Sequence, residues 1–88
     1  MSVIHKYQFT NGPFLAIPLD PGAIVRHVDM QGGLITLWIE KFKPQDDFDP
    51  ARMFRIFGTG HEIPPDYKYV GSCINGSYVW HIFERTNS

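Results

Sequence analysis

The sequence predicts a mostly β protein, a small antiparallel barrel or sandwich of six to seven short strands. Runs of β-branched and aromatic residues alternate with clusters of Gly, Pro, Asn and Asp about every eight to twelve residues, as strands alternate with turns. Helix signals are few, and at most one short helical turn is expected near residues 49–53. Because the 88 residues are 43% hydrophobic and 19% charged, we expect a single β domain over residues 1–88.

Two strands are expected at the start of the chain. Val3 to Phe9 is rich in strand-forming residues and is followed by a turn over Thr10 to Pro13. Phe14 to Leu19 is a second extended run, and Pro18 places it near the edge of a sheet because proline cannot donate a backbone hydrogen bond to a neighbouring strand. Asp20 to Ala23 then forms another turn.

A hairpin is expected where Gly32 and Gly33 separate two alternating runs, because a two-residue turn favours residues with positive φ. With this loop Gln31 lies opposite Leu34, and the hairpin has one apolar and one polar face. We expect the apolar face to carry Ile24, Arg26, Val28, Met30, Ile35, Leu37 and Ile39, with Arg26 opposite Ile39. We expect the other face to carry Val25, His27, Asp29, Gln31, Leu34, Thr36, Trp38 and Glu40, with His27 beside Trp38 and Asp29 beside Thr36.

A polar stretch follows this hairpin. Lys43 to Arg52 is expected to be a loop, or at most one helical turn that begins at Asp49 with Pro50 as its first residue. Met53 to Phe57 is expected to be a strand, and Gly58 to Asp66 a long turn.

The last hairpin is expected to turn at Asn75 and Gly76, between strands over Tyr67 to Ile74 and Ser77 to Arg85. In this register Gly71 lies opposite Trp80 and leaves room for the indole. Trp80 is expected to share its face with Tyr69, Cys73, Tyr78 and Ile82. The opposite face is expected to carry Val70, Ser72, Val79, His81 and Phe83.

The charges and the single cysteine restrict the class of protein. Eight Lys and Arg against nine Asp and Glu give a net charge of −1, without the basic stripe of a protein that binds a nucleic-acid polymer. A small anionic ligand is compatible with these charges. Since Cys73 is alone and no signal peptide or membrane-spanning stretch is recognised, we expect an intracellular protein with no internal disulfide and no membrane partner.

The run Gly58-Thr59-Gly60-His61 has two interpretations. Directly after a strand, the glycines permit a bend in which backbone N–H groups converge on an anion, and the Thr59 hydroxyl and the His61 imidazole complete the cradle. The run lacks the lysine and the helix of a phosphate-binding loop, however, and glycines at the end of a strand usually serve only the turn. The residues alone leave both interpretations open.

No metal or catalytic site is expected. The short spacing and cysteine support of a zinc site are missing among the four histidines, His5, His27, His61 and His81. Cys73 is expected to be buried and inert. Ser72 and His81 are expected to be neighbours across the last hairpin, but no acidic side chain is placed to orient the histidine. We therefore expect no metal, no cofactor and no enzymatic activity.

Aromatic side chains on strands give the strongest indication of a binding surface, because rings on a sheet stack nucleobases at about 1 to 3 kcal/mol per base. The strand aromatics considered are Trp38, Tyr69, Tyr78 and Trp80. Core packing is expected for Phe54, Phe57 and Phe83. Trp38 differs from the other rings because hydrogen-bonding side chains surround it, and such a setting suits a ligand or a subunit interface.

Three stretches, "PGAIVRHVDMQGGLITLWIE", "FRIFGTGHEIP" and "YVGSCINGSYVWHIFE", together resemble a known family. They are similar to a widespread family of small phage-encoded proteins marked by a Gly-Thr-Gly-His turn and a C-terminal Val-Trp-His-aliphatic-Phe-Glu strand. Glu62 departs from the family pattern, which has proline at this position.

The resemblance implies a viral sponge protein of the anti-CBASS kind. Such a protein binds a cyclic oligonucleotide immune signal, such as a cyclic dinucleotide, without cleaving it, and acts as a homodimer or homotetramer in the cytoplasm of the infected bacterial host. The implied ligand-binding residues are Arg26, His27, Gln31, Trp38, Gly58, Thr59, Gly60 and His61. In this assignment Trp38 stacks a base, Gln31 or His27 contacts its edge, the Gly58–His61 turn cradles a phosphate, and Arg26 or Arg55 adds charge.

Two alternatives stay open at this point. The same aromatic sheet face suits a protein–protein interaction module that binds a host or phage protein, with the Gly-Thr-Gly-His turn purely structural. A nucleotide-cleaving enzyme is the third reading, and it would release product on incubation. The identity of the ligand and the number of subunits are not specified by the residues.

Overall fold

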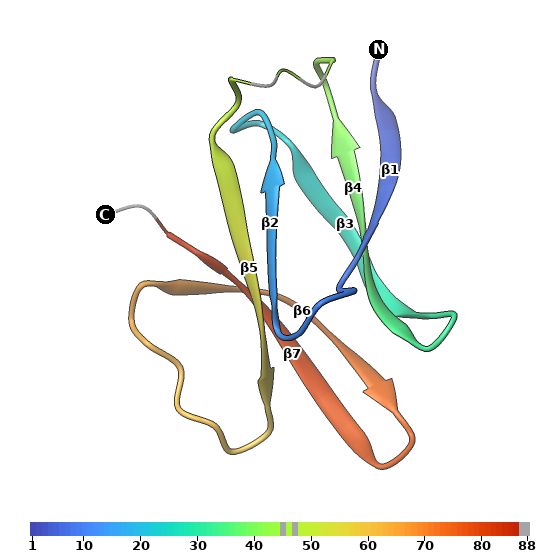
Figure 1. Cartoon of the computed structure of the whole chain (residues 1–88), viewed down its shortest axis with the longest axis vertical. Coiled ribbons are helices and arrows are strands. Elements are labelled where there is room, and N and C mark those ends of the chain that lie inside the picture. The colour runs from blue at the N-terminus through green and yellow to red at the C-terminus, as the bar shows by residue number, and fades with distance from the viewer. Residues whose placement is uncertain (45, 47, 87–88) are drawn as a thin grey trace.

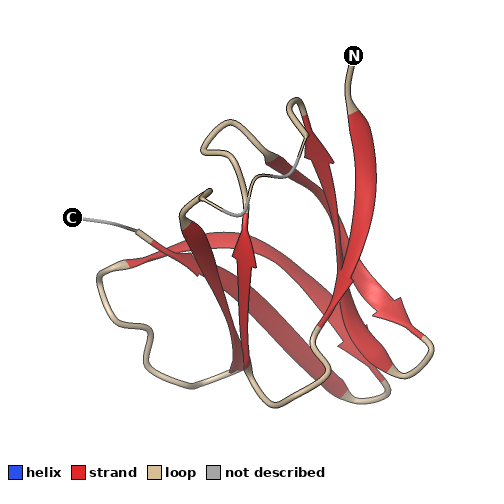
Figure 2. Cartoon of the chain, turned by 45° about the horizontal axis from the view of Figure 1, so that its top comes forward, coloured by secondary structure: helices blue, strands red, loops and turns tan. Residues whose placement is uncertain are grey.

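The computed structural model describes residues 1–44, 46 and 48–86, and this part of the chain contains seven strands and no helix (Figures 1 and 2). No helix in it is therefore long and apolar enough to cross a membrane. The strands are β1 (Val3–Gln8), β2 (Phe14–Pro18), β3 (Ile24–Gln31), β4 (Leu34–Lys41), β5 (Ala51–Gly58), β6 (Tyr67–Asn75) and β7 (Tyr78–Arg85).

The strands form two antiparallel sheets, one in the order β1-β4-β3 and one in the order β2-β5-β7-β6. The sheets pack face to face and are not closed into a barrel, so the predicted sandwich is confirmed and the barrel alternative is wrong. β2 lies at the edge of its sheet, as Pro18 predicts. A helical turn near 49–53 does not form, because Ala51 already pairs with Pro18 as the first residue of β5. The expected loop over Lys43 to Arg52 includes Gln45 and Asp47, which lie outside the described residues.

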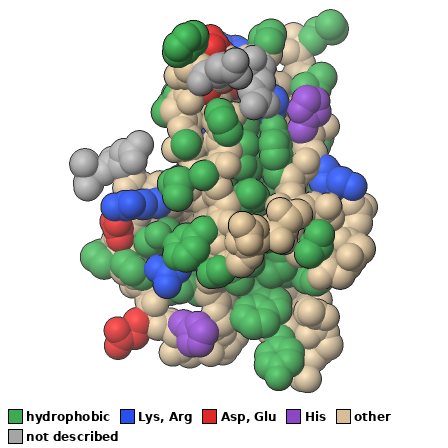
Figure 3. Space-filling view, in the orientation of Figure 1, with side chains coloured by type: hydrophobic (Ala, Val, Ile, Leu, Met, Phe, Trp, Pro, Cys, Tyr) green, Lys and Arg blue, Asp and Glu red, His purple; other side chains and the backbone are tan. Residues whose placement is uncertain are grey.

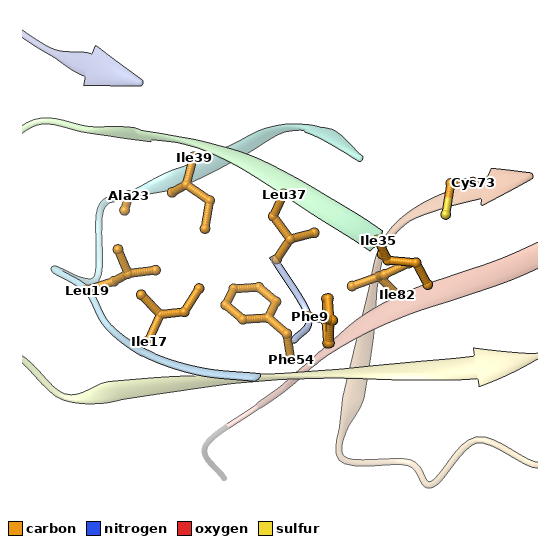
Figure 4. Close-up of a cluster of buried hydrophobic side chains, with 10 residues drawn as sticks. All are labelled: Phe9, Ile17, Leu19, Ala23, Ile35, Leu37, Ile39, Phe54, Cys73 and Ile82. Atoms are coloured by element: carbon orange, nitrogen blue, oxygen red, sulfur yellow. The ribbon is translucent and has the colours of Figure 1, made fainter. Parts of the chain in front are cut away.

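The core lies between the two sheets, and Phe54 of β5 sits near its centre (Figure 4). β4 shows the alternation that builds it, since Leu37 and Ile39 are fully buried, and each such side chain adds about 1.5 to 3 kcal/mol of hydrophobic free energy. The buried cluster consists of Phe9, Ile17, Leu19, Ala23, Ile35, Leu37, Ile39, Phe54, Cys73 and Ile82.

Phe57 is also buried, but it belongs to a small aromatic cluster outside this main core. Its ring packs edge to face on Tyr67 and Phe83, at 5.4 Å between ring centroids in both cases. The Arg55 guanidinium lies 4.5 Å from the Phe57 ring centroid, in a cation–π contact. Arg55 is therefore engaged in packing the outer face of its own sheet.

The turn at Asp20 is closed by side-chain chemistry and tied to the second sheet. The Asp20 carboxylate accepts a hydrogen bond from the Gly22 N–H at 2.7 Å, and the Ala23 N–H donates to the Asp20 carbonyl at 3.1 Å. The Arg52 guanidinium donates a hydrogen bond to the Ala23 carbonyl at 2.6 Å. It also donates to both carboxylate oxygens of Glu84, at 2.6 and 2.8 Å. One arginine thus connects β5, β7 and the turn.

The β3–β4 hairpin has the predicted Gly32–Gly33 loop, with φ of 59° and 78°, and the predicted pairs from Gln31 back to His27. Beyond His27 the register shifts at a β-bulge, so that Val25, not Arg26, pairs with Ile39. The prediction for this end is therefore wrong. Val25 packs against the core, whereas Ile24 is exposed, because the extra residue of a bulge reverses the alternation beyond it.

The β6–β7 hairpin turns one residue later than predicted, at Gly76 and Ser77, so that Asn75 pairs with Tyr78. Gly76 has a φ of 62° and Ser77 has no positive φ, the pattern of a type II′ turn. The predicted pairing of Gly71 with Trp80 is consequently wrong. Gly71 pairs with Ile82, and Trp80 pairs with Cys73.

A second bulge in β6 changes two further side chains. The register shifts between Tyr69 and Gly71, which leaves Val70 without a partner on β7. Tyr69 pairs with Phe83 and packs on its ring at 5.4 Å, so it does not share the face of Trp80 as expected. Val70 instead packs against the core.

The two bulged strands close one side of the sandwich, because β3 lies against β6. A Cβ atom on Gly71 would stand 2.8 Å from Cγ2 of Val28, closer than real Cβ contacts. The glycine is therefore required by the approach of β3, and not by the indole of Trp80.

Candidate functional site

A hollow of about 310 Å³ lies where β3 meets β6. Both bulges are in its wall, Arg26 on one side and Val70 on the other. Bulges re-aim side chains and are enriched beside binding sites. The residues that line the hollow are Val25, Arg26, His27, Val28, Val70, Gly71 and Ser72.

The hollow has an apolar base and polar walls. Val25, Val28 and Val70 pack against the core, which leaves Arg26, His27 and Ser72 as the polar groups. The Arg26 side chain is 50% exposed, and its Nε donates to the Glu40 carboxylate at 2.7 Å. A partly neutralised guanidinium, an imidazole and a hydroxyl are therefore the groups that a ligand would meet first.

Trp38 does not line the hollow, but it stands beside His27, which does, on the outer face of the first sheet. Its ring centroid lies 5.2 Å from that of His27, with the planes tilted by 44°, and Lys6 of β1 is its partner in the register. His27 Nε2 is 3.6 Å from the Asp29 carboxylate. The predicted neighbours His27 and Trp38 are thus confirmed, with a lysine on the other side of the indole.

Gln31 lies further along the same hairpin and does not reach the hollow. The side-chain amide of Gln8 donates to the Gln31 carbonyl at 3.1 Å and to the Thr36 hydroxyl at 3.1 Å. These two bonds tie β1 to the end of the β3–β4 hairpin. The Gln31 carbonyl therefore helps to hold β1 against the hairpin.

A chain of hydroxyl and imidazole groups leads from the hollow across the outer face of the second sheet. The Ser72 hydroxyl is 2.7 Å from the Tyr69 hydroxyl and 2.8 Å from Nδ1 of His81. On the other side of the ring, Nε2 of His81 is 3.0 Å from the Thr59 hydroxyl, which donates to the Val79 carbonyl at 3.4 Å. Ser72 and His81 are therefore neighbours, as predicted.

Two arrangements of protons satisfy this chain, one for each tautomer of His81, and the first has the Thr59 hydroxyl donating to the Val79 carbonyl. Because the Thr59 hydroxyl donates to a carbonyl, it accepts from Nε2–H of His81, and the neutral ring then has a free lone pair on Nδ1. Nδ1 accepts from the Ser72 hydroxyl, whose oxygen accepts from Tyr69. In either tautomer Nδ1 of His81 is hydrogen-bonded to the Ser72 hydroxyl at the wall of the hollow.

The Gly58–His61 turn closes on itself. The Gly58 N–H donates to Nδ1 of His61 at 3.2 Å, and the His61 N–H donates to the Gly58 carbonyl at 3.2 Å. Gly60 has a φ of 90°, which explains the glycine at this position. The Gly58 donor of the expected anion cradle is thus occupied by the histidine of the same turn.

The structure brings together part of the predicted site. Arg26, His27 and Trp38 are adjacent, and Thr59 is joined to the hollow through His81 and Ser72. The rest of the predicted cradle, Gly58, Gly60 and His61, lies at the end of β5 (Figure 1) and does not line the hollow. From the sequence, Tyr69 is expected as a strand aromatic and Ser72 and His81 as neighbours, but these three residues are not assigned to the binding site; the Ser72–His81 pairing was the usable signal.

Two titratable groups define the chemistry near the site. Hydrogen bonds from Ser2 and Arg26 hold the pKa of Glu40 below its ordinary value of 4.5, so this carboxylate keeps its charge. Burial raises the pKa of the Cys73 thiol, which keeps the sulfur protonated and unreactive. No group of three or more metal-ligating side chains occurs within residues 1–44, 46 and 48–86.

A second hollow, of about 360 Å³, lies near the C-terminal end of β7. Arg52, Lys68, Glu84 and Arg85 line part of it, but Arg52 and Glu84 bind each other and Arg85 Nε donates to Asp66 at 3.3 Å. Its charged groups thus serve mainly to hold the fold together. We take the hollow between β3 and β6 as the candidate site.

Comparison with known proteins gives a family and no function. No curated protein and no solved structure matches the chain. The family described as "Domain of unknown function (DUF7352)" matches residues 1–88. Because this match spans the full sequence, the chain belongs to the DUF7352 family.

Proposed function

We propose that the protein is a non-catalytic viral immune-evasion protein that binds a cyclic oligonucleotide signal, such as a cyclic dinucleotide, and withholds it from its receptor in the cytoplasm of the infected bacterial host. The observation that carries the proposal is the hollow between β3 and β6, where Arg26, His27 and Ser72 meet beside the indole of Trp38. The resemblance to phage-encoded proteins supports the setting.

The chemistry of a cyclic oligonucleotide matches these groups. Trp38 offers a face on which a base stacks, at about 1 to 3 kcal/mol. Arg26 and His27 supply donors for a phosphate, and charge-assisted hydrogen bonds are the stronger kind. The Ser72 hydroxyl, held by His81 and Thr59, keeps a lone pair that accepts a hydrogen bond from a base or a ribose hydroxyl. In this arrangement the Gly58–His61 turn acts by positioning Thr59.

The arrangement around Ser72 favours sequestration over cleavage. A serine nucleophile needs a histidine base that is itself oriented by a third group, usually an acid. His81 Nε2 faces the Thr59 hydroxyl instead, which cannot stabilise an imidazolium as a carboxylate does. We therefore expect bound nucleotide to be recovered intact after the complex is heated, and recovery of a cleaved product would contradict the non-catalytic proposal.

The first test is a melting-temperature shift against a panel of cyclic di- and trinucleotides and cyclic ADP-ribose isomers. A ligand at 100 times its dissociation constant adds about 2.7 kcal/mol to the free energy of unfolding, which raises the Tm by roughly 10 to 20 °C in a domain of this size. No shift for any ligand of the panel would contradict the proposal.

Variants locate the binding site. Trp38→Ala and His27→Ala should each abolish the shift, because they remove the stacking face and a phosphate donor. Tyr78→Ala is the matched control, since it removes a ring that is 66% exposed and is not among the residues that line the hollow. His61→Ala should lower the Tm of the free protein by loosening the turn and leave the ligand-induced shift nearly unchanged.

A second candidate function, a protein–protein interaction module, is favoured by the end of the β6–β7 hairpin. Ile74 and Tyr78 are 68% and 66% exposed there, and the Tyr78 ring stacks on Trp80 with centroids 5.8 Å apart and planes 16° apart. Hydrophobic side chains gather over this lower end of the molecule in Figure 3. If this surface carries the function, Tyr78→Ser abolishes binding of a host or phage protein and Trp38→Ala does not.

A further inference from the structure

The two sheets have four edge strands, and these differ in how well they are protected against pairing with a strand of another molecule. β3 and β6 lie against each other, and each contains a bulge. β2 ends at Pro18, which has no N–H to offer. Bulges, proline and covering elements are the usual protections against edge-to-edge pairing. β1 is the remaining edge, and within the described residues it has no bulge and no proline, and Lys6 is its only Lys or Arg.

β1 is regular and apolar at its exposed end. It pairs with β4 without a bulge from Val3 to Gln8, so its outer side presents an uninterrupted row of backbone groups. Val3 and Ile4 point to opposite faces of the sheet and are 53% and 56% exposed. Beside them lies a hollow of about 370 Å³ whose wall includes Met1 and Phe42.

We propose that β1 pairs antiparallel with β1 of a second copy of this chain, about a two-fold axis at Ile4. The side chains favour this register. Ile4 of one copy meets Ile4 of the other on the outer face of the sheet. Lys6, which has no ion pair within the described residues, then faces Ser2 of the second copy, whose hydroxyl donates to the Glu40 carboxylate at 2.5 Å.

Charge complementarity favours a second copy over an unrelated strand. Each Lys6 ammonium approaches the Glu40 carboxylate of the other copy, and the two-fold axis makes this contact twice. An isologous pair of edges also closes the assembly, because it leaves no free β1 edge for further growth. The result is one six-stranded sheet in the order β3-β4-β1-β1-β4-β3.

The dimer extends the proposed function. Ile4, Lys6 and Trp38 lie on the same outer face, since Lys6 pairs with Trp38 and Ile4 with Glu40. Both Trp38 rings therefore face the same side of the joined sheet, as a ligand with two bases requires. The dimer itself does not rest on nucleotide binding, because its mass is measured without ligand.

The first experiment measures mass by size-exclusion chromatography with light scattering. The wild-type protein should give at least twice the chain mass of 10.1 kDa, and Ile4→Glu should lower the mass at least twofold by placing two carboxylates together at the axis. Ile74→Glu is the matched control, because Ile74 is 68% exposed on another strand, and it should keep the wild-type mass. A monomeric wild type, or an unchanged mass for Ile4→Glu, would overturn the proposal.

The second experiment tests the register. Facing residues of antiparallel strands have Cα atoms about 4.5 to 5.5 Å apart, within the range that a disulfide spans. Ile4→Cys should therefore form a covalent dimer under mild oxidation, whereas Ile74→Cys should not. If Ile74→Cys cross-links and Ile4→Cys does not, the β1 interface is wrong. A dimer that gives no nucleotide shift would instead contradict only the proposed function.

Discussion

The β3–β4 and β6–β7 hairpins are built alike but expose their sequences differently. Each has a two-residue loop and one bulge on its edge strand. In the first hairpin the bulge exposes Arg26, which binds Glu40 at the surface. In the second it turns Val70 inward and is followed by Gly71, which makes room for Val28. The comparison teaches that a bulge can expose a charged side chain on one strand and turn an apolar side chain into the core on another.

The largest effect is expected from the ion pair that anchors the second hairpin. Arg52→Met should lower the free energy of unfolding by about 2 to 3 kcal/mol, because it leaves Glu84 and the Ala23 carbonyl without their donor. Arg26→Met in the first hairpin should cost much less than Arg52→Met, since the Arg26–Glu40 pair is exposed. Urea denaturation of both variants measures the difference, and equal losses would contradict the comparison.

The contact between the two bulged strands gives the next effect. Gly71→Ala should lower the free energy of unfolding by about 1 to 3 kcal/mol, because the new Cβ meets Val28 at 2.8 Å. Val28→Ala in the same chain should recover part of this loss by removing the clashing methyl groups. If the double variant is as unstable as the sum of the single variants, the clash with Val28 is not the cause.

The loop of the second hairpin can be tested by a smaller change. Asn75 is a strand residue that pairs with Tyr78, and asparagine is a poor strand former. Asn75→Thr should therefore stabilise the protein by about 0.5 kcal/mol. If Asn75 occupied the loop with positive φ, the same change would destabilise it, so the sign of the change in Tm decides between the two registers.

The smallest effect concerns acid. Because hydrogen bonds from Ser2 and Arg26 lower the pKa of Glu40, this group binds protons more weakly in the folded than in the unfolded chain. Its contribution to stability is complete above pH 4.5 and is lost as the pH falls through the lowered pKa. Glu40→Gln should remove this part of the pH dependence, measured by urea denaturation between about pH 2 and 6. An unchanged profile would contradict it.

The strands and the main turns could be predicted because they depend on local chemistry. Gly32 and Gly33 supply the positive φ of their loop, and the apolar alternation of β4 specifies its buried face. The second loop could also have been read from Gly76-Ser77, which fits a type II′ turn. That error moved each partner by two positions, so it left Trp80 and His81 on the correct faces.

The bulges could not be predicted, because they follow from contacts distant in sequence. Nothing around Arg26 or Val70 marks an extra residue, and the need for Gly71 arises from Val28, which lies in the other sheet. The hollow of the candidate site could not be predicted for the same reason, because it lies where the two bulged strands meet. Trp38 with His27 was predictable because that pair depends on the hairpin register alone.

The separation of β2 from its partner has a consequence for how the chain folds. The two hairpins form from neighbouring residues, but β2 joins its sheet only through β5, with Phe14 paired to Arg55. Closing so long a loop costs chain entropy before any contact compensates it, and domains dominated by such pairings fold in milliseconds to seconds. The hairpins are therefore the natural early structures, and the docking of β2, which brings Ile17 into the core, completes the sandwich.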